Sequence, residues 1–249
     1  MAEIAGPREH IIPLIRSRDL RALLEQAGTL HGHFCPGVSM GVMSAVFGLH
    51  LLAEERGVSV AQVLAADGLE DLLVIVETNS CFSDGIQVVT GCTFGNNALI
   101  YLDLGKTAVT LTGRSGDGVR VVVRPGYRDL IDELVPQFGS LFDDVIKGRS
   151  RDPEKVRLFK ETSAEASTCL LDADPERLFA ARALRADVPD YAPIRESAVC
   201  ARCGESVMGG RTAADNLFAG VDGEKGERET LCLACAGAPI RRLTGEGIE

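Results

Sequence analysis

The sequence predicts a large domain of helices and about four strands, followed by a small cysteine-rich module. Three features of the 249-residue chain indicate this: helical periodicity alternates with short apolar runs in the first half, four cysteines form two close pairs near the C-terminus, and a charged, proline-containing segment separates the two parts. We expect a main domain over residues 1–148, a helical or extended connecting arm over 149–196 and a four-cysteine domain over 197–249.

The first two predicted helices meet at the segment HGHFCPG. Ser17 can cap a helix that Gly32 ends, and the apolar positions between them follow the helical period. Pro36 suits the first position of a second helix, whose apolar positions continue to Gly57. Three glycines leave one side of this helix thin enough for close backbone approach: Gly37, Gly41 and Gly48.

The strands follow in the next stretch of chain. A short helix capped by Ser59 leads to a strand over 72–78, whose near-continuous apolar run indicates burial on both faces. A helix over 83–90 comes next, and Gly91 ends it. Three more strands are expected at 98–104, 107–113 and 119–123, so the sheet has about four strands. An interrupted helical pattern over 127–146 closes the domain.

Composition excludes several classes of protein. The net charge is −10, and even the cysteine-rich segment 197–249 has six basic and eight acidic residues, so direct nucleic-acid binding has no electrostatic basis. The longest apolar stretch, 42–53, is much shorter than the about 20 residues of a membrane span. No secretory signal is present, and eight cysteines then indicate metal sites or catalytic thiols. We expect a cytoplasmic protein that does not bind membranes.

The strongest single signal is at the C-terminus. Cys200 and Cys203 form one pair with the spacing of a zinc knuckle, Cys232 and Cys235 form another, and 28 residues separate the pairs. Four thiolates satisfy a tetrahedral structural zinc, and so short a module needs the metal to fold. An iron–sulfur site and a redox dithiol are the alternatives.

A second group of metal-binding side chains lies in the main domain. Cys35 is expected at the N-cap of the helix that Pro36 begins, where the helix dipole favours the thiolate, and His31 and His33 stand beside it. Cys81 follows the end of the buried strand, and Cys92 follows the next helix. We expect these five residues to line one pocket for a transition metal, with Asp84 and Glu77 nearby to support the ligands or to transfer protons.

The simpler interpretation is that Cys81 and Cys92 are small buried apolar residues and that the histidines cap a helix end. Sulfur and imidazole ligands suit zinc, and iron, nickel and copper as well, so spacing does not choose the metal. Cys169, on a predicted helix, and the isolated His10 and His50 are expected to serve packing or solvation.

Four motifs carry a family resemblance: HGHFCPG at 31–37, CFSDGIQVVTGCTFG at 81–95, LFAARAL at 178–184 and CARCGESVM…CLACAG at 200–237. Together they resemble the FmdE family of formylmethanofuran dehydrogenase proteins. The resemblance implies an α+β fold with a helix, strand, helix and three-strand core and a roughly four-stranded mixed sheet, like the catalytic domain of glyceraldehyde-3-phosphate dehydrogenase. It also implies a zinc-type metal at the His/Cys pocket, with iron or nickel as alternatives, a C-terminal zinc ribbon and a homodimer.

Three functions fit these features. The first is an accessory protein whose pocket holds a transition metal, or handles metal or sulfur, for a partner metalloenzyme that contains molybdenum, tungsten or another metal. The second is a metal-dependent enzyme acting on a small substrate, in which Cys35 and Asp84 are catalytic and the metal keeps an open position. The third is a zinc-ribbon regulator that binds nucleic acid or a polymerase, and the charge of the ribbon disfavours direct nucleic-acid binding but not a protein partner.

Overall fold

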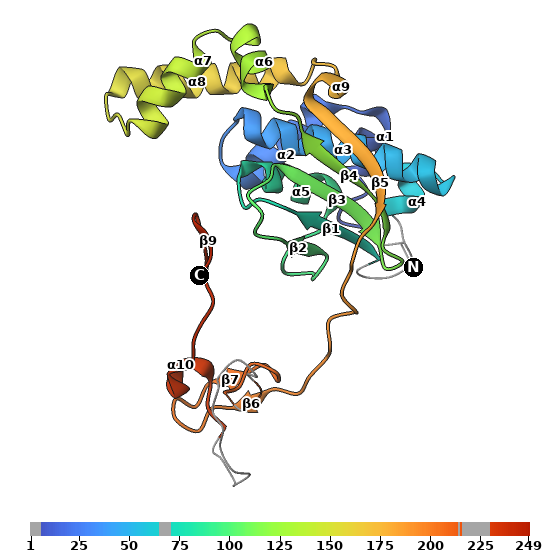
Figure 1. Ribbon diagram of the computed structural model, residues 1–249, viewed down its shortest axis with the longest axis vertical. Helices are drawn as coiled ribbons and strands as arrows, with labels where there is room; N and C mark the ends of the chain where they lie inside the picture. Colours follow the sequence, from blue (N-terminus) through green and yellow to red (C-terminus); the bar gives the residue numbers. More distant parts are fainter. Residues whose placement is uncertain (1–5, 65–70, 214, 216–229) are drawn as a thin grey trace. The chain divides into compact units, whose positions relative to one another are not determined.

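A mixed five-stranded sheet organises the first of the two units into which the chain folds, Met1–Asp190 and Tyr191–Glu249 (Figure 1). The computed structural model describes residues 6–64, 71–213, 215 and 230–249. The strands of the large sheet are β1 (Leu72–Val76), β2 (Leu99–Tyr101), β3 (Ala108–Gly113), β4 (Asp117–Val123) and β5 (Phe179–Arg185). Their order is β2-β1-β3-β4-β5, with β1 and β2 parallel and the other neighbours antiparallel.

Helices precede, connect and follow these strands. Those of the N-terminal half are α1 (Ile12–Ser17), α2 (Leu20–His31), α3 (Pro36–Arg56), α4 (Val60–Leu64) and α5 (Cys81–Thr90). The next group is α6 (Tyr127–Leu134), α7 (Phe138–Phe142), the π-helix η1 (Asp143–Lys147), α8 (Pro153–Leu170) and α9 (Pro175–Leu178). The α+β class predicted from the sequence is confirmed. The likeness to glyceraldehyde-3-phosphate dehydrogenase stays a prediction.

The long helix α3 is the centre of the core. It is apolar on all sides and most of its residues are buried, as expected for a helix enclosed by other elements. Its length and composition would allow it to cross a membrane, but 78% of its most apolar window is buried within the fold, which is typical of a core helix. It starts at Pro36 and ends before the left-handed Gly57, as the sequence predicts.

Helices α3 and α5 touch through their backbones. A Cβ atom added to Gly41 would lie 2.1 Å from the carbonyl oxygen of Phe82, and one added to Gly85 would lie 2.4 Å from that of Val38. Only glycine permits this approach. The contact lies one to two turns after the first residue of each helix, so it brings the N-terminal ends of α3 and α5 close together.

Three local expectations differ from the structure. Ser17 ends α1, and the cap of α2 is Asp19, whose side chain accepts a hydrogen bond from the backbone N–H of Ala22. Helix α5 begins at Cys81, two residues earlier than expected. Strand β2 is only three residues long because the chain leaves the sheet after Tyr101.

The sheet has five strands, one more than expected, and the additional strand comes from the segment predicted to be a connecting arm. Strand β5 pairs along its whole length with β4, from Phe179 opposite Val123 to Arg185 opposite Asp117. Helix α8, from the same segment, packs on α3. Residues 153–185 are therefore part of the first unit.

Helices α6 to α8 come between β4 and β5 in the chain, and they form a lobe beyond one end of these two strands (Figure 1). It contains a group of three partly buried aromatic rings, in which the centroids of Phe138 and Phe142 lie 6.2 and 6.3 Å from that of Phe159. The backbone N–H of Arg124, where the lobe begins, donates to the carbonyl of Leu178, where it ends, at 2.7 Å. The chain therefore leaves β4 and returns to β5 at neighbouring points, which this hydrogen bond joins.

The second unit contains short elements around its cysteines. These are β6 (Ala198–Val199), β7 (Ser206–Val207), α10 (Leu233–Ala236), β8 (Leu243–Thr244) and β9 (Gly247–Ile248). Strands β6 and β7 form one hairpin, and β8 and β9 form another. Within its described residues, buried apolar side chains are few, so apolar burial contributes little to the stability of this unit.

Candidate metal centres

Three helix ends bring His31, Cys35 and Cys81 together in the first unit. Their potential ligand atoms, one imidazole nitrogen and two sulfurs, all lie within 4.8 Å of one another. The distance from His31 Nε2 to Cys35 Sγ is 3.7 Å. The three side chains are partly buried, so the group lies at the edge of the core and not in its centre.

The local sequence explains this convergence. His31 is the last residue of α2, and Gly32 ends the helix in the left-handed region with φ of +84°. Cys35 is the extended N-cap of α3, and Cys81 is the first residue of α5. The glycine contact between α3 and α5 then places both sulfurs beside the end of α2.

Asp84 fixes the imidazole of His31. Its Oδ2 lies 2.7 Å from His31 Nδ1, and its Oδ1 accepts a hydrogen bond of 3.2 Å from the side-chain amide of Gln87. With Nδ1 bound to a carboxylate, Nε2 is the nitrogen left for a metal, on the side where the sulfurs lie. This carboxylate–histidine arrangement is the usual support of a metal-binding histidine.

The two thiols affect each other. The Cys35 side chain hydrogen bonds to the Cys81 sulfur and lowers the pKa of Cys81 to about 6, against the opposing effect of burial. The same bond and burial raise the pKa of Cys35 above its usual range. From the sequence, the favoured thiolate is expected at Cys35, at the start of α3. A hydrogen bond from Cys35 to Cys81 favours the thiolate at Cys81 instead.

Helix α8 holds the segment between α2 and α3 in place. The hydroxyl of Ser163 donates to the carbonyl of Phe34 at 3.1 Å, and that of Ser167 donates to the carbonyl of Cys35 at 3.3 Å. Ser167 also shares a 2.5 Å contact with the hydroxyl of Ser39. The backbone of the ligand-bearing segment is therefore fixed by hydroxyl groups from the helical lobe.

The other residues predicted to line the pocket, His33 and Cys92, are not part of the three-residue group. His33 is exposed and its ring centroid is 4.2 Å from that of His31, but it is not part of the three-residue group. Cys92 is buried and its sulfur lies 3.4 Å from the carbonyl of Leu72. Helix α5 separates Cys92 from Cys81, since ten residues of helix extend about 15 Å.

Glu77 is also outside the group. Its carboxylate forms two hydrogen bonds with Arg120, of 2.6 and 2.8 Å, and it is 5% exposed. Arg120 lies on β4, so this ion pair bridges strands of the sheet. Its bidentate geometry satisfies both oxygens, which makes Glu77 a structural residue of the sheet.

The second unit brings together all four cysteines predicted there. One ligand atom from each of Cys200, Cys203, Cys232 and Cys235 lies within 4.8 Å of the others. The backbone N–H of Cys232 points to the sulfur of Cys200 at 3.3 Å. Backbone N–H groups of Cys203 and Cys232 lower the pKa of Cys200 to about 6, while the Cys232 side chain raises that of Cys235 to about 12.

The two groups differ in the chemistry that they offer. Four thiols form a complete tetrahedral set and leave no position for a further ligand, whereas one imidazole and two thiols leave one position open. Soft sulfur and imidazole donors fit a transition metal in both places. The first group has the donor set of a reactive or exchangeable centre, and the second has that of a structural one.

Sequence reasoning missed the residues that support the first centre. Gln87 orients Asp84, and Ser163 and Ser167 fix the ligand-bearing segment. The two serines are four residues apart on one face of α8, a small-residue pattern that the sequence contains but that identifies no partner.

Comparison with known proteins gives consistent results. A family described as "FmdE, Molybdenum formylmethanofuran dehydrogenase operon" matches residues 30–180. A probable S-adenosyl-L-methionine-binding protein of Archaeoglobus fulgidus is 36% identical over 230 residues, which are 92% of this chain and 56% of that protein, so the chain spans little more than half of this relative.

One solved structure is also similar. It is that of a tungsten formylmethanofuran dehydrogenase FmdE-like protein from Syntrophus aciditrophicus, with 22% identity, coverage of 89% of this chain and 94% of that one, and a TM-score of 0.49. These values carry no residue assignments. The family match contains His31, Cys35, Cys81 and Asp84, and it extends over more than half of the sequence. The chain belongs to the FmdE family of formylmethanofuran dehydrogenase operon proteins.

Proposed function

We propose that this protein is a metal-binding accessory protein, which holds an exchangeable transition metal at His31, Cys35 and Cys81 and uses it in support of a partner metalloenzyme. The observation that carries the proposal is the three-ligand group itself, with its sulfurs and imidazole within 4.8 Å and its histidine supported by Asp84. Zinc is the metal that this donor set suits first, with iron or nickel as alternatives.

An incomplete ligand set supports transfer. A metal held by three protein ligands can accept a fourth ligand from another protein or a small molecule before the first three release it. The partial exposure of all three side chains would permit such an approach. These residues hold the metal, and Asp84 keeps the imidazole in the orientation that binds it.

The cysteine cluster of the second unit serves a different purpose in the proposal. Its four thiolates hold a structural zinc whose binding free energy folds the unit. With no open coordination position, the unit would act as a docking surface for the partner. The free thiols of all eight cysteines are consistent with a reducing compartment, and we propose the cytoplasm.

Metal stoichiometry of the purified full chain tests the proposal. Elemental analysis by mass spectrometry should give about two metals per chain for the parent protein. The Cys35→Ser and Cys81→Ser variants should each lose one metal and keep the circular dichroism of the fold. Cys169→Ser is the matched control, because Cys169 is a partly buried thiol outside both groups, and it should retain two metals.

Exchange kinetics then separate an accessory role from catalysis. We expect a chromogenic chelator to remove the metal of the first centre within minutes while the ribbon metal stays bound. Retention of two metals by both the Cys35→Ser and Cys81→Ser variants would show that the first centre binds none. A metal that resists the chelator as strongly as the ribbon metal would favour a metal-dependent enzyme instead.

S-adenosyl-L-methionine binding, which the name of the archaeal relative gives to that protein, is not part of this proposal. The chain spans only 56% of that relative, and the ligand site of the relative can lie in the remainder.

We also propose that two copies of the chain associate. Light scattering after size exclusion should therefore give twice the mass of the 26.5 kDa chain.

A further inference from the structure

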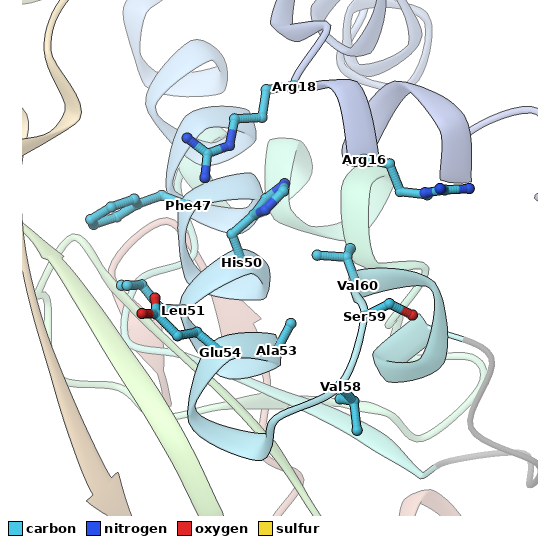
Figure 2. Close-up of a pocket in the computed structure, with 10 residues that line it drawn as sticks. All are labelled: Arg16, Arg18, Phe47, His50, Leu51, Ala53, Glu54, Val58, Ser59 and Val60. Carbon is cyan, nitrogen blue, oxygen red and sulfur yellow. The ribbon is translucent and has the colours of Figure 1, made fainter.

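A cavity of about 430 Å³ lies in the first unit, at a distance from the metal ligands. It is open to solvent and is lined by the end of α1, the C-terminal half of α3 and the turn that leads into α4 (Figure 2). His50, which lines it, is fifteen residues after Cys35 on the same long helix, so the two sites are about 22 Å apart along the axis of α3. The cavity is therefore separate from the metal centre.

An unpaired positive charge lies at this cavity. Arg18 has no ion-pair or hydrogen-bond partner for its guanidinium among the described residues, and neither has Arg16. Figure 2 shows the guanidinium of Arg18 on the side of Phe47 and His50, whereas that of Arg16 is directed away from them. In a chain of net charge −10, several other arginines are paired with carboxylates.

The backbone of Arg18 is in an unusual conformation. It ends α1 in the left-handed region, with φ of 57° and ψ of 37°, where glycine is the usual residue. An arginine there is disfavoured by its Cβ, and such conformations gather at functional sites. The backbone conformation alone would favour glycine at position 18, so the presence of arginine indicates a role for its side chain.

The remaining lining residues define what the cavity can hold. The Nε2 atom of His50 lies 3.0 Å from the carbonyl of Ile15, which fixes the ring and leaves Nδ1 for a ligand. Phe47, Leu51 and Val60 supply apolar surface, and Glu54 supplies a carboxylate that has no side-chain partner among the described residues. A half-apolar cavity of this size with a few polar groups is typical of small-molecule sites.

We infer that this cavity binds a small organic anion, whose carboxylate or phosphate group is held by Arg18 and whose apolar or aromatic body lies on Phe47 and Leu51. Guanidinium groups recognise both kinds of anion through paired hydrogen bonds. Glu54, one helical turn after His50, repels a second negative charge and so favours ligands with their charge at one end. The inference is independent of the metal centre.

Binding of the fluorescent anion 8-anilinonaphthalene-1-sulfonate to the metal-loaded full chain tests this inference, with AMP and benzoate as competitors. Arg18→Gly removes the guanidinium and suits the left-handed backbone, so the variant should fold. Arg18→Gly should raise the dissociation constant of the fluorescent anion about tenfold or more. Arg149→Gly is the matched control, because Arg149 is a second exposed arginine with positive φ, of 54°, outside the cavity.

Removal of the negative charge of Glu54 should change the affinity in the opposite direction. Glu54→Gln should tighten binding of the same probe, because it removes a negative charge from the lining. Displacement by AMP alone would identify a phosphate ligand, and displacement by benzoate alone a carboxylate. Equal binding by the Arg18→Gly and Arg149→Gly variants would overturn the inference, as would the absence of binding by all three probes at millimolar concentration.

Discussion

The backbone contact between α3 and α5 makes a quantitative prediction for Gly41→Ala. The new Cβ would lie 2.1 Å from the carbonyl oxygen of Phe82, and both atoms belong to helices that are held in the core. Ordinary van der Waals contact begins at 3.4 Å, so the two helices must separate or deform to make this room. Overpacking of this kind costs about 1–3 kcal/mol.

Helix propensity acts in the opposite direction. Alanine is favoured over glycine within a helix by about 1 kcal/mol. The net effect of Gly41→Ala should therefore be a loss of up to about 2 kcal/mol in the free energy of unfolding of the first unit. Because the contact also sets the spacing of Cys35 and Cys81, the variant should bind metal more weakly at the first centre.

Gly48→Ala is the control on the same helix. Its Cβ would meet Leu111 Cδ1 at 2.4 Å and Val121 Cγ2 at 3.2 Å, and both atoms are the ends of buried side chains and not backbone. Side chains can shift without moving a helix and the same gain in propensity applies, so Gly48→Ala should lower stability less than Gly41→Ala. Urea unfolding of the metal-free chain, followed by circular dichroism, and competition with a metal chelator provide the measurements. If Gly41→Ala matched Gly48→Ala in both assays, the backbone contact would not determine the centre.

Three further predictions concern side chains. Asp84→Asn should lower metal affinity at the first centre about 10- to 100-fold in a chelator competition, because it weakens the support of His31, and Gln87→Ala should have a smaller effect. Glu77→Ala should reduce the free energy of unfolding by about 3–5 kcal/mol in urea, because it leaves a partly buried arginine unpaired, without loss of metal. In the metal-free protein at pH 7, iodoacetamide should modify Cys81, whose pKa is lowered to about 6, well before Cys92, whose pKa burial raises to about 11. Peptide mass spectrometry gives the order of modification, and equal rates at Cys81 and Cys92 would contradict it.

Much of the first centre follows from helix starts and stops that the sequence encodes. Gly32 ends α2 directly after His31, and Pro36 begins α3 directly after Cys35. Both signals act over a few residues and are legible without tertiary structure. The position of Cys92 could also have been deduced, because a helix between Cys81 and Cys92 holds its two ends apart.

Strand β5 could not be predicted in the same way. Its sequence, FAARALR, is rich in alanine, leucine and arginine, which favour helices, and it becomes a strand by pairing with β4 over seven residues. The contacts of Ser163 and Ser167 with residues 34 and 35 are equally non-local. Tertiary contacts of this kind override local preference, and a single sequence does not reveal them.

The hydrogen bond between Arg124 and Leu178 has a consequence for how members of the family can diverge. The chain leaves the sheet at Arg124 and returns to it at Leu178, and these two residues are hydrogen-bonded neighbours. The number of residues between them can therefore change while β4 and β5 stay paired. Such changes are limited where residues 124–178 pack on the core, and at the serine face of α8, which holds the backbone of residues 34 and 35. We therefore expect the exposed part of residues 124–178 to tolerate insertions and deletions in relatives, provided that the hydrogen bonds of Ser163 and Ser167 are kept.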